Sequence, residues 1–136
     1  MALALVTGGC GYIGTHACIA LLEGGWEVIV IDNLSNNHPE ALRRVRDLAG
    51  GRLEMIEGDV LDLVALDSAF ARGAVDAVIH LAGRKAVGES VTRPISYYET
   101  NLAGTVELLK AMERHAVKDL VFSSSCECFS CATSTR

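Results

Sequence analysis

The sequence of 136 residues predicts an α/β fold, a doubly wound parallel sheet in one domain. Short apolar runs rich in Val, Ile and Leu alternate with helix-like stretches, and a glycine-rich turn joins the first run to the first helix. Apolar strands that alternate with helices are typical of a parallel sheet covered on both faces. The crossovers are expected to be right-handed. The expected strand order is 3-2-1-4-5, with a ligand crevice at the switch point between strands 1 and 4.

The predicted elements follow the apolar runs and the residues that interrupt them. Strands are predicted at residues 2–6, 27–31, 52–57, 76–81 and 119–123, and helices at 12–23, 39–49, 62–71 and 94–115. The pair Gly24-Gly25 ends the first helix. Pro39 and Pro94 open the second and fourth helices, because proline is tolerated in the first turn.

The first strand runs directly into a glycine-rich turn. Its sequence is Thr7-Gly8-Gly9-Cys10-Gly11-Tyr12-Ile13-Gly14, and a helical pattern follows at once. Glycines allow a tight turn and let backbone N–H groups approach a pyrophosphate at the positive end of a helix. This context predicts a site for a dinucleotide cofactor.

Acidic residues end the next two strands. Asp32 lies 18 residues after Gly14, where a carboxylate accepts hydrogen bonds from the adenosine ribose and repels a 2′-phosphate, so NAD is favoured over NADP. The alternative for Asp32 is a loop aspartate that caps a turn before Asn33. Asp59 is placed to accept from the adenine amino group, with Val60 against the ring. Its alternative is the N-cap region of the following helix.

The fourth strand ends in His80-Leu81-Ala82-Gly83, where small residues let the backbone approach a cofactor. Taken alone, His80 is typical of a hydrogen-bonded structural histidine at a strand end rather than of a catalyst. None of the four histidines has metal-ligand spacing to another. The sequence therefore predicts no metal site among them.

Composition excludes several other classes of protein. A net charge of −5 and a pI near 5.3 argue against non-specific nucleic-acid binding. No apolar run approaches the ~18–20 residues of a membrane span, and the apolar start is too short for a signal peptide. The five cysteines are an odd number without secretory features, so reduced thiols and a cytoplasmic location are expected.

Residues 126–136 differ from the rest, because they have neither helical nor strand periodicity and hold three of the five cysteines. A zinc site is one interpretation of Cys126, Cys128 and Cys131, but a fourth ligand is missing nearby. The other interpretation is a disordered end. We therefore divide the chain into an incomplete dinucleotide-binding domain at 1–125 and a tail at 126–136.

Six segments resemble the N-terminal part of the UDP-glucose 4-epimerases, a family of the extended short-chain dehydrogenase/reductase superfamily with a Rossmann-like NAD-binding domain. They are Val6–Gly14, Val30–Asn36, Glu57–Val60, Val78–Ser90, Pro94–Thr105 and Leu120–Ser125. The most diagnostic is Lys85-Ala86-Val87-Gly88-Glu89-Ser90, which favours the epimerases over sugar-nucleotide dehydratases and decarboxylases. The resemblance spans residues 3–125.

The resemblance implies a complete set of cofactor contacts. The NAD pyrophosphate would be held by Gly8, Gly11, Tyr12, Ile13 and Gly14. The adenosine ribose and nearby phosphate would contact Asp32, Asn33 and Asn36, and adenine would contact Asp59 and Val60. The cofactor would also be lined by Leu81, Ala82, Gly83 and Lys85, with Asn101 supporting the site from the fourth helix.

On the substrate side, the resemblance implies that Lys85, Ala86 and Val87 reach toward a UDP-sugar. Ser125 would be catalytic, bonding the reacting sugar hydroxyl. Arg84 stands where the family usually has an apolar residue, and Leu81 replaces a commoner aromatic residue. The implied reaction is the NAD-dependent interconversion of UDP-glucose and UDP-galactose at C4, in galactose metabolism.

The family's base is a tyrosine followed four residues later by a lysine, and the chain has no such pair. Tyr12, Tyr97 and Tyr98 are followed at that spacing by His16, Asn101 and Leu102. After Ser125 the family continues Ala-Thr-Val-Tyr-Gly, whereas this chain reads Cys-Glu-Cys-Phe-Ser. We therefore expect a truncated epimerase, inactive as given, whose tail arises from a shifted reading frame.

Two further expectations follow from this interpretation. The strand at 119–123 would be an open apolar edge, so the fragment should self-associate and bind NAD weakly, whereas intact family members form homodimers. The alternative functions are a non-catalytic NAD-binding module and a fragment of a related sugar-nucleotide dehydratase or decarboxylase.

Overall fold

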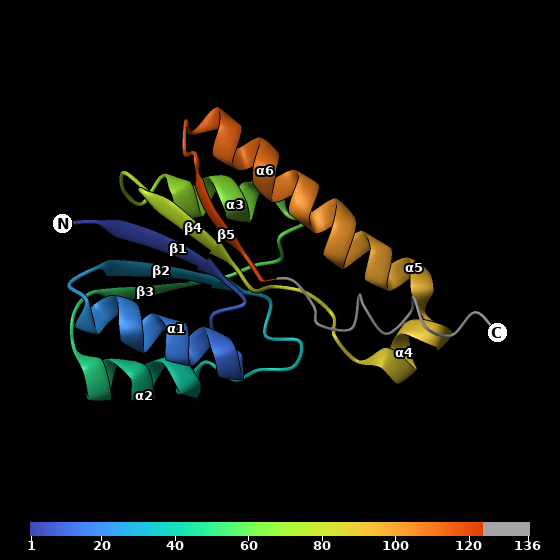
Figure 1. Cartoon of the computed structure of the whole chain (residues 1–136), viewed down its shortest axis with the longest axis horizontal. Coiled ribbons are helices and arrows are strands. Elements are labelled where there is room, and N and C mark those ends of the chain that lie inside the picture. The colour runs from blue at the N-terminus through green and yellow to red at the C-terminus, as the bar shows by residue number, and fades with distance from the viewer. Residues whose placement is uncertain (124–136) are drawn as a thin grey trace.

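The computed structural model describes residues 1–123, except for the side chain of Val87. These residues form a five-stranded parallel sheet in the order β3-β2-β1-β4-β5 (Figure 1), which confirms the predicted fold class and strand order. The strands are β1 (Leu3–Thr7), β2 (Glu27–Asp32), β3 (Leu53–Glu57), β4 (Ala77–His80) and β5 (Asp119–Phe122). The helices are α1 (Tyr12–Glu23), α2 (Glu40–Ala49), α3 (Leu63–Phe70), α4 (Val87–Thr92), α5 (Pro94–Tyr97), the π-helix η1 (Tyr98–Ala103) and α6 (Gly104–Arg114).

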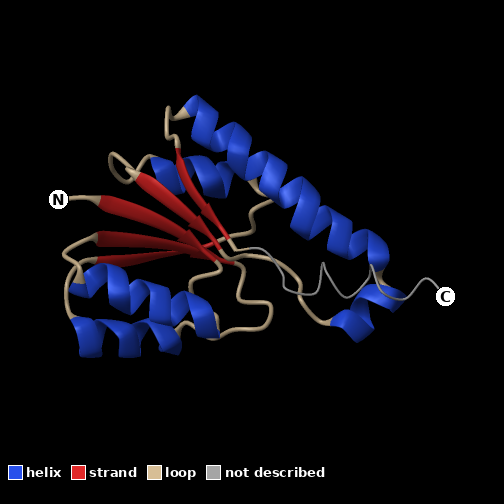
Figure 2. Ribbon diagram, viewed as in Figure 1, coloured by secondary structure: helices blue, strands red, loops and turns tan. Residues whose placement is uncertain are grey.

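Helices cover both faces of the sheet (Figure 2). Because side chains alternate along a strand, neighbouring residues of β1 enter different cores. Leu5 packs in the core that includes Leu66 of α3 and Leu108 of α6. Val6 packs in the core that includes Cys18 of α1 and Leu42 of α2. This double coverage leaves the ends of the strands as the open part of the sheet.

Two features of the helices differ from the prediction. The expected continuous helix at 94–115 is divided into α5, η1 and α6, with a π-helical segment between Tyr98 and Ala103. The short helix α4 has no counterpart in the prediction. Its six residues include Gly88, Val91 and Thr92, whose weak helix propensity and short length leave no helical periodicity to detect.

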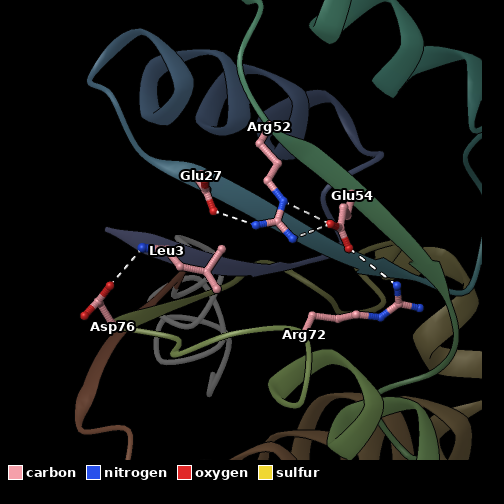
Figure 3. Close-up of polar contacts among 6 residues, drawn as sticks. All are labelled: Leu3, Glu27, Arg52, Glu54, Arg72 and Asp76. Carbon is pink, nitrogen blue, oxygen red and sulfur yellow. Dashed lines mark hydrogen bonds and ion pairs between the residues drawn. The ribbon is translucent and has the colours of Figure 1, made fainter. Parts of the chain in front are cut away.

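A cluster of ion pairs lies at the amino-terminal edge of the sheet (Figure 3). Arg52 contacts Glu27 at 3.0 Å and Glu54 at 2.7 Å, and Arg72 contacts Glu54 at 3.5 Å. The backbone N–H of Leu3 donates to Asp76 at 2.8 Å. The ion pairs join β2 to β3, and the Leu3 contact joins β1 to the residue before β4. All lie at the edge opposite the carboxyl ends of the strands, and each partly exposed ion pair adds little to stability.

Strand β5 lies at the edge of the sheet, and within residues 1–123 it pairs with β4 alone. Val121 and Phe122 are 59% and 54% exposed. An exposed apolar edge strand offers its unpaired backbone groups to another chain. The described part of the molecule therefore has the apolar edge that the sequence predicts.

We expect the purified chain to self-associate with rising concentration through this edge. Val121→Lys should shift the chain toward monomer, because a charged side chain opposes pairing between edge strands. The matched control is Val64→Lys, since Val64 is 79% exposed on α3, away from the edge. Light scattering coupled to size-exclusion chromatography measures the mass. A concentration-independent monomer for the unmodified chain would contradict the prediction.

Candidate functional site

A cleft of about 290 Å³ lies at the carboxyl ends of the strands, where the loops after β1, β2, β3 and β4 meet. Most of the predicted site residues line it: Gly8, Asp32, Asn33, Asn36, Asp59, Val60, Leu81, Ala82, Gly83, Lys85 and Ala86. Six further residues line it that the sequence did not predict as site residues: Ile31, Ser35, Asn37, Gly58, Arg84 and Thr100. The cleft therefore coincides with the switch point between β1 and β4, where ligands of this fold class bind.

The remaining predicted residues fall into two groups. Some are described but do not line the cleft, and the others lie beyond residue 123. Gly11, Tyr12, Ile13 and Gly14 belong to the turn and first helical turn beside it, with Tyr12 and Ile13 largely exposed. Asn101 lies in η1, behind the cleft wall. Val87 begins α4. Ser125 and the cysteines Cys126, Cys128 and Cys131 fall outside the described residues.

The glycine turn is tightly packed against its own backbone. Gly8 has φ +69°, and a Cβ atom there would lie 2.8 Å from the Ala82 nitrogen. A Cβ atom at Gly14 would lie 2.4 Å from the Gly8 carbonyl oxygen. Helix α1 then begins after Gly11 without a side-chain cap. Its first N–H groups have no acceptor within the helix, which makes this terminus suitable for an anion.

Asp32 joins the end of β2 to the glycine turn. It is 5% exposed, and its carboxylate accepts from the Cys10 N–H at 3.0 Å and from the Leu34 N–H at 2.8 Å. The Leu34 contact is the turn-capping role considered as the alternative, and it coexists with a position in the cleft wall. The Cys10 contact was missed, because no local pattern shows that residues 22 apart in sequence meet across two loops.

Asp59 organises the loop after β3. Its carboxylate accepts from the Leu61 N–H and from the Asn33 side-chain amide, both at 2.9 Å. The cap of α3 is Asp62, which accepts from Val64 and Ala65, so the interpretation of Asp59 as the capping residue is wrong. The Asx-type turn at Asp59 keeps this side chain three residues short of the helix.

His80 is buried, with 2% of its surface exposed. Its ring nitrogens lie 2.6 Å from the Thr7 hydroxyl and 2.9 Å from the Thr105 hydroxyl. Burial, with a smaller contribution from the charge of Lys85, lowers the pKa of His80 below its ordinary value. Both nitrogens are therefore satisfied by a neutral ring, in agreement with the structural role predicted for this histidine.

The loop after β4 is held from behind by the helices that follow it. Asn101 accepts from the Arg84 N–H at 2.7 Å and donates to the Arg84 carbonyl at 2.9 Å. The Tyr97 hydroxyl donates to the Ala86 carbonyl at 2.7 Å and lies 3.2 Å from Glu89. Burial and the neighbouring Glu89 raise the pKa of Tyr97, so this phenol stays protonated at neutral pH.

The described cysteines are buried thiols rather than ligands or nucleophiles. Burial raises the pKa of both Cys10 and Cys18 to about 12, and Asp32 contributes at Cys10. Among residues 1–123, no group of three metal-ligating side chains comes together. No helix in that part of the chain is long and apolar enough to span a membrane.

We expect Cys10 and Cys18 to resist alkylation in the folded chain, because the thiolate is the reactive form and a pKa of about 12 leaves almost none at neutral pH. Peptide mass spectrometry after iodoacetamide treatment measures each site separately. The same reaction in urea provides the control, since unfolding exposes both thiols. Rapid labelling of either residue under native conditions would show that the turn or α1 opens readily.

Comparison with known proteins shows which family this chain resembles. Residues 4–135 match the NAD dependent epimerase/dehydratase family. The UDP-glucose 4-epimerase of Bacillus subtilis is 56% identical over 121 residues, which cover 89% of this chain and 36% of that protein. That of Mus musculus is 53% identical over 127 residues, covering 89% of this chain and 37% of that protein.

Solved structures show the same likeness. UDP-glucose 4-epimerase from Bifidobacterium longum, in complex with NAD⁺ and UDP, has a TM-score of 0.89 and 49% identity, covering 92% of this chain and 37% of that one. The UDP-Glc/GlcNAc 4-epimerase of Campylobacter jejuni has a TM-score of 0.85 at 30% identity, covering 93% and 38%. The chain therefore spans little more than a third of the length of these relatives.

Proposed function

The chain belongs to the NAD dependent epimerase/dehydratase family, and from this premise we propose that its cleft binds NAD as the cofactor half of an enzyme that interconverts UDP-glucose and UDP-galactose at C4. The observation that carries the proposal is the meeting of the glycine turn, Asp32 and the β4 loop around one cleft. The Bifidobacterium longum structure, a complex with NAD⁺ and UDP, supports the same ligands for this chain.

The residues around the cleft fit a dinucleotide. The close approach of Gly14 to Gly8 leaves room for backbone but for no side chain, as the close packing of helix on strand in a dinucleotide-binding turn requires. Asp32 would accept from the adenosine ribose, with Asn33 and Asn36 beside it, and Asp59 with Val60 would contact adenine. Gly8, Gly11, Tyr12, Ile13 and Gly14 would hold the pyrophosphate. Leu81, Ala82, Gly83 and Lys85 would line the rest of the cofactor.

The negative charge of Asp32 also supports selection of NAD over NADP. A 2′-phosphate would bring a second anion beside a carboxylate that already accepts hydrogen bonds from Cys10 and Leu34. Lys85, Ala86 and Val87 are proposed to face the UDP-sugar, and Ser125 to hydrogen-bond its reacting hydroxyl. When bound, NAD supplies reversible hydride acceptance, and the protein supplies orientation and proton transfer.

Proton transfer limits what the 136 residues can do alone. The sequence contains no Tyr-x-x-x-Lys pair, and Tyr97 donates to the Ala86 carbonyl with a raised pKa, which opposes a role as base. We therefore propose that this chain, assayed by itself, binds NAD without catalysing epimerisation. The intact family activity would require a base from outside these residues.

Two assays on the same preparation test the proposal. Calorimetric titration with NAD should show saturable binding, and a coupled assay with UDP-galactose should show no conversion above background. An intact relative such as the Bacillus subtilis enzyme is the positive control for the coupled assay. Absence of NAD binding by the folded chain would overturn the cofactor assignment. Measurable turnover would instead overturn the proposed inactivity.

A further inference from the structure

The side-chain hydroxyl of Thr7 has three hydrogen-bond partners and can donate to only one of them. Its Oγ1 is fully buried and accepts from the Leu81 and Ala82 N–H groups, both at 3.2 Å. The same oxygen lies 2.6 Å from Nδ1 of His80. The Leu81 N–H is shared with the Thr7 carbonyl, 3.1 Å away. Because two N–H groups face the hydroxyl oxygen, its one proton points to Nδ1. Nδ1 is therefore an acceptor and carries no proton.

The hydrogen bonds on the Nε2 side of the His80 ring complete the series. Nε2 carries the proton of the neutral ring and donates to the Thr105 hydroxyl at 2.9 Å. Thr105 in turn donates to the Asn101 carbonyl at 2.7 Å. The Asn101 side chain holds both the N–H and the carbonyl of Arg84. One directed series of bonds thus runs from β1 through His80 to η1 and returns to the loop after β4.

The residues at the two ends of this series form one wall of the cleft. Leu81, Ala82 and Arg84 all line it, and Ala82 lies against Gly8 of the glycine turn. Asp32, Asn33 and Asp59 line the other part, and within residues 1–123 no direct hydrogen bond joins them to His80, Thr7 or Thr105. The series of hydrogen bonds therefore positions the residues in one half of the cleft and makes no contact with the other half.

We propose that His80 is a positioning residue for the cofactor, which in its neutral Nε2–H form joins Thr7 to Thr105 and holds the β4 wall against the glycine turn. This inference rests on the proposed binding of NAD. His80 itself does not line the cleft, so it acts through the backbone of Leu81, Ala82 and Arg84.

Protonation of His80 would break this arrangement. A proton on Nδ1 would compete for the Thr7 lone pairs with the Leu81 and Ala82 N–H groups. Leu81 also donates to the Thr7 carbonyl at 3.1 Å, so Ala82 is the residue whose contact with β1 would be weakened most. The groups that surround the ring are the Thr7 hydroxyl from β1, the Thr105 hydroxyl from α6 and the Phe122 ring from β5, 5.6 Å away. The charged group that acts on it is Lys85, which also opposes protonation.

Binding of NAD and of AMP to the same variants tests the proposal. Thr105→Val removes the acceptor for Nε2, and Thr105→Ser, which keeps the hydroxyl, is the matched control. Thr105 is only half-buried, so both variants should fold. Thr105→Val leaves Nε2 without an acceptor and also removes the bond to the Asn101 carbonyl. We expect it to weaken NAD about 2- to 10-fold and to leave AMP unchanged. The serine variant should resemble the unmodified chain.

The pH dependence of the affinity for NAD provides a second test, because a purely electrostatic effect of His80 would have the opposite sign. As the pH falls from about 8 to about 5, the affinity for NAD, whose pyrophosphate does not titrate in this range, should decline with protonation of His80. An imidazolium acting only through its charge would attract the pyrophosphate and raise the affinity for NAD. ¹⁵N NMR of the unmodified chain should also show the Nε2–H tautomer at neutral pH, a result that requires no variant.

The outcomes separate this inference from the function on which it rests. If the unmodified chain binds neither NAD nor AMP, the proposed function fails. If it binds both and Thr105→Val weakens them equally or not at all, the positioning role fails. An Nδ1–H tautomer or a charged ring at neutral pH would overturn it as well.

Discussion

Gly14→Ala is expected to destabilise the chain by about 2–4 kcal/mol and to abolish NAD binding. The new Cβ atom would lie 2.4 Å from the Gly8 oxygen and 2.6 Å from the Gly9 Cα. Both are backbone atoms of a turn that packs against Val30 and Ala82, so neither can move without shifting the sheet. Urea unfolding measures the stability, and calorimetry measures the binding.

Gly88→Ala is the matched control for this substitution. Gly88 is also helical, in α4, but nothing lies within 4 Å of the position of its Cβ atom. Helix propensity alone favours alanine over glycine by roughly 0.5–1 kcal/mol, so this variant should be unchanged or slightly more stable. Equal stability of the two variants would show that the glycine turn is looser than the close approach of its backbone atoms implies.

Asp32→Ala is expected to lower the free energy of unfolding by about 2–4 kcal/mol, because it removes a buried carboxylate that accepts two backbone N–H bonds. The Cys10 N–H would lose its partner inside the turn, and the Leu34 N–H would lose its own in the loop. Asp32→Asn keeps the shape but removes the charge. We expect it to reduce the preference for NAD over NADP about tenfold.

The control for Asp32 is Asp47→Ala, since Asp47 is an exposed residue of α2. Its loss should change the unfolding free energy by less than about 0.5 kcal/mol and leave cofactor preference unaltered. Unfolding in urea and titration with both dinucleotides cover all three variants. An Asp32→Asn variant that prefers NAD as strongly as the unmodified chain would contradict the role assigned to this charge.

The sequence was sufficient to predict the sheet, because β1, β2, β4 and β5 each contain an uninterrupted apolar run and β3 is apolar except at Glu54 and Glu57. The order β3-β2-β1-β4-β5 is the one expected for a dinucleotide-binding sheet, which the glycine turn after β1 indicates. The same reasoning placed Asp32, Asp59 and the end of β4 at one edge of the sheet. It needed only the rule that parallel strands end on the same side.

The features that the sequence did not predict are mainly contacts between residues distant in sequence. The bonds from Cys10 to Asp32 and from His80 to Thr7 and Thr105 cross between loops and strands. The π-helical segment and α4 were missed because neither has a sustained apolar stripe. The N-cap region of α3 remained an alternative for Asp59, because Asp59 and Asp62 are chemically alike and only the turn geometry shows that Asp62 is the cap.

The position of the cofactor is tested most directly by ¹H–¹⁵N NMR spectra of the chain during titration with NAD. Amide signals of Gly11 to Gly14, Asn33, Val60 and Ala82 should shift with one common saturation curve. Signals of Glu27, Arg52 and Arg72, at the opposite edge of the sheet, should stay in place. Shifts confined to that opposite edge, or none at saturating NAD, would contradict a dinucleotide site at the carboxyl ends of the strands.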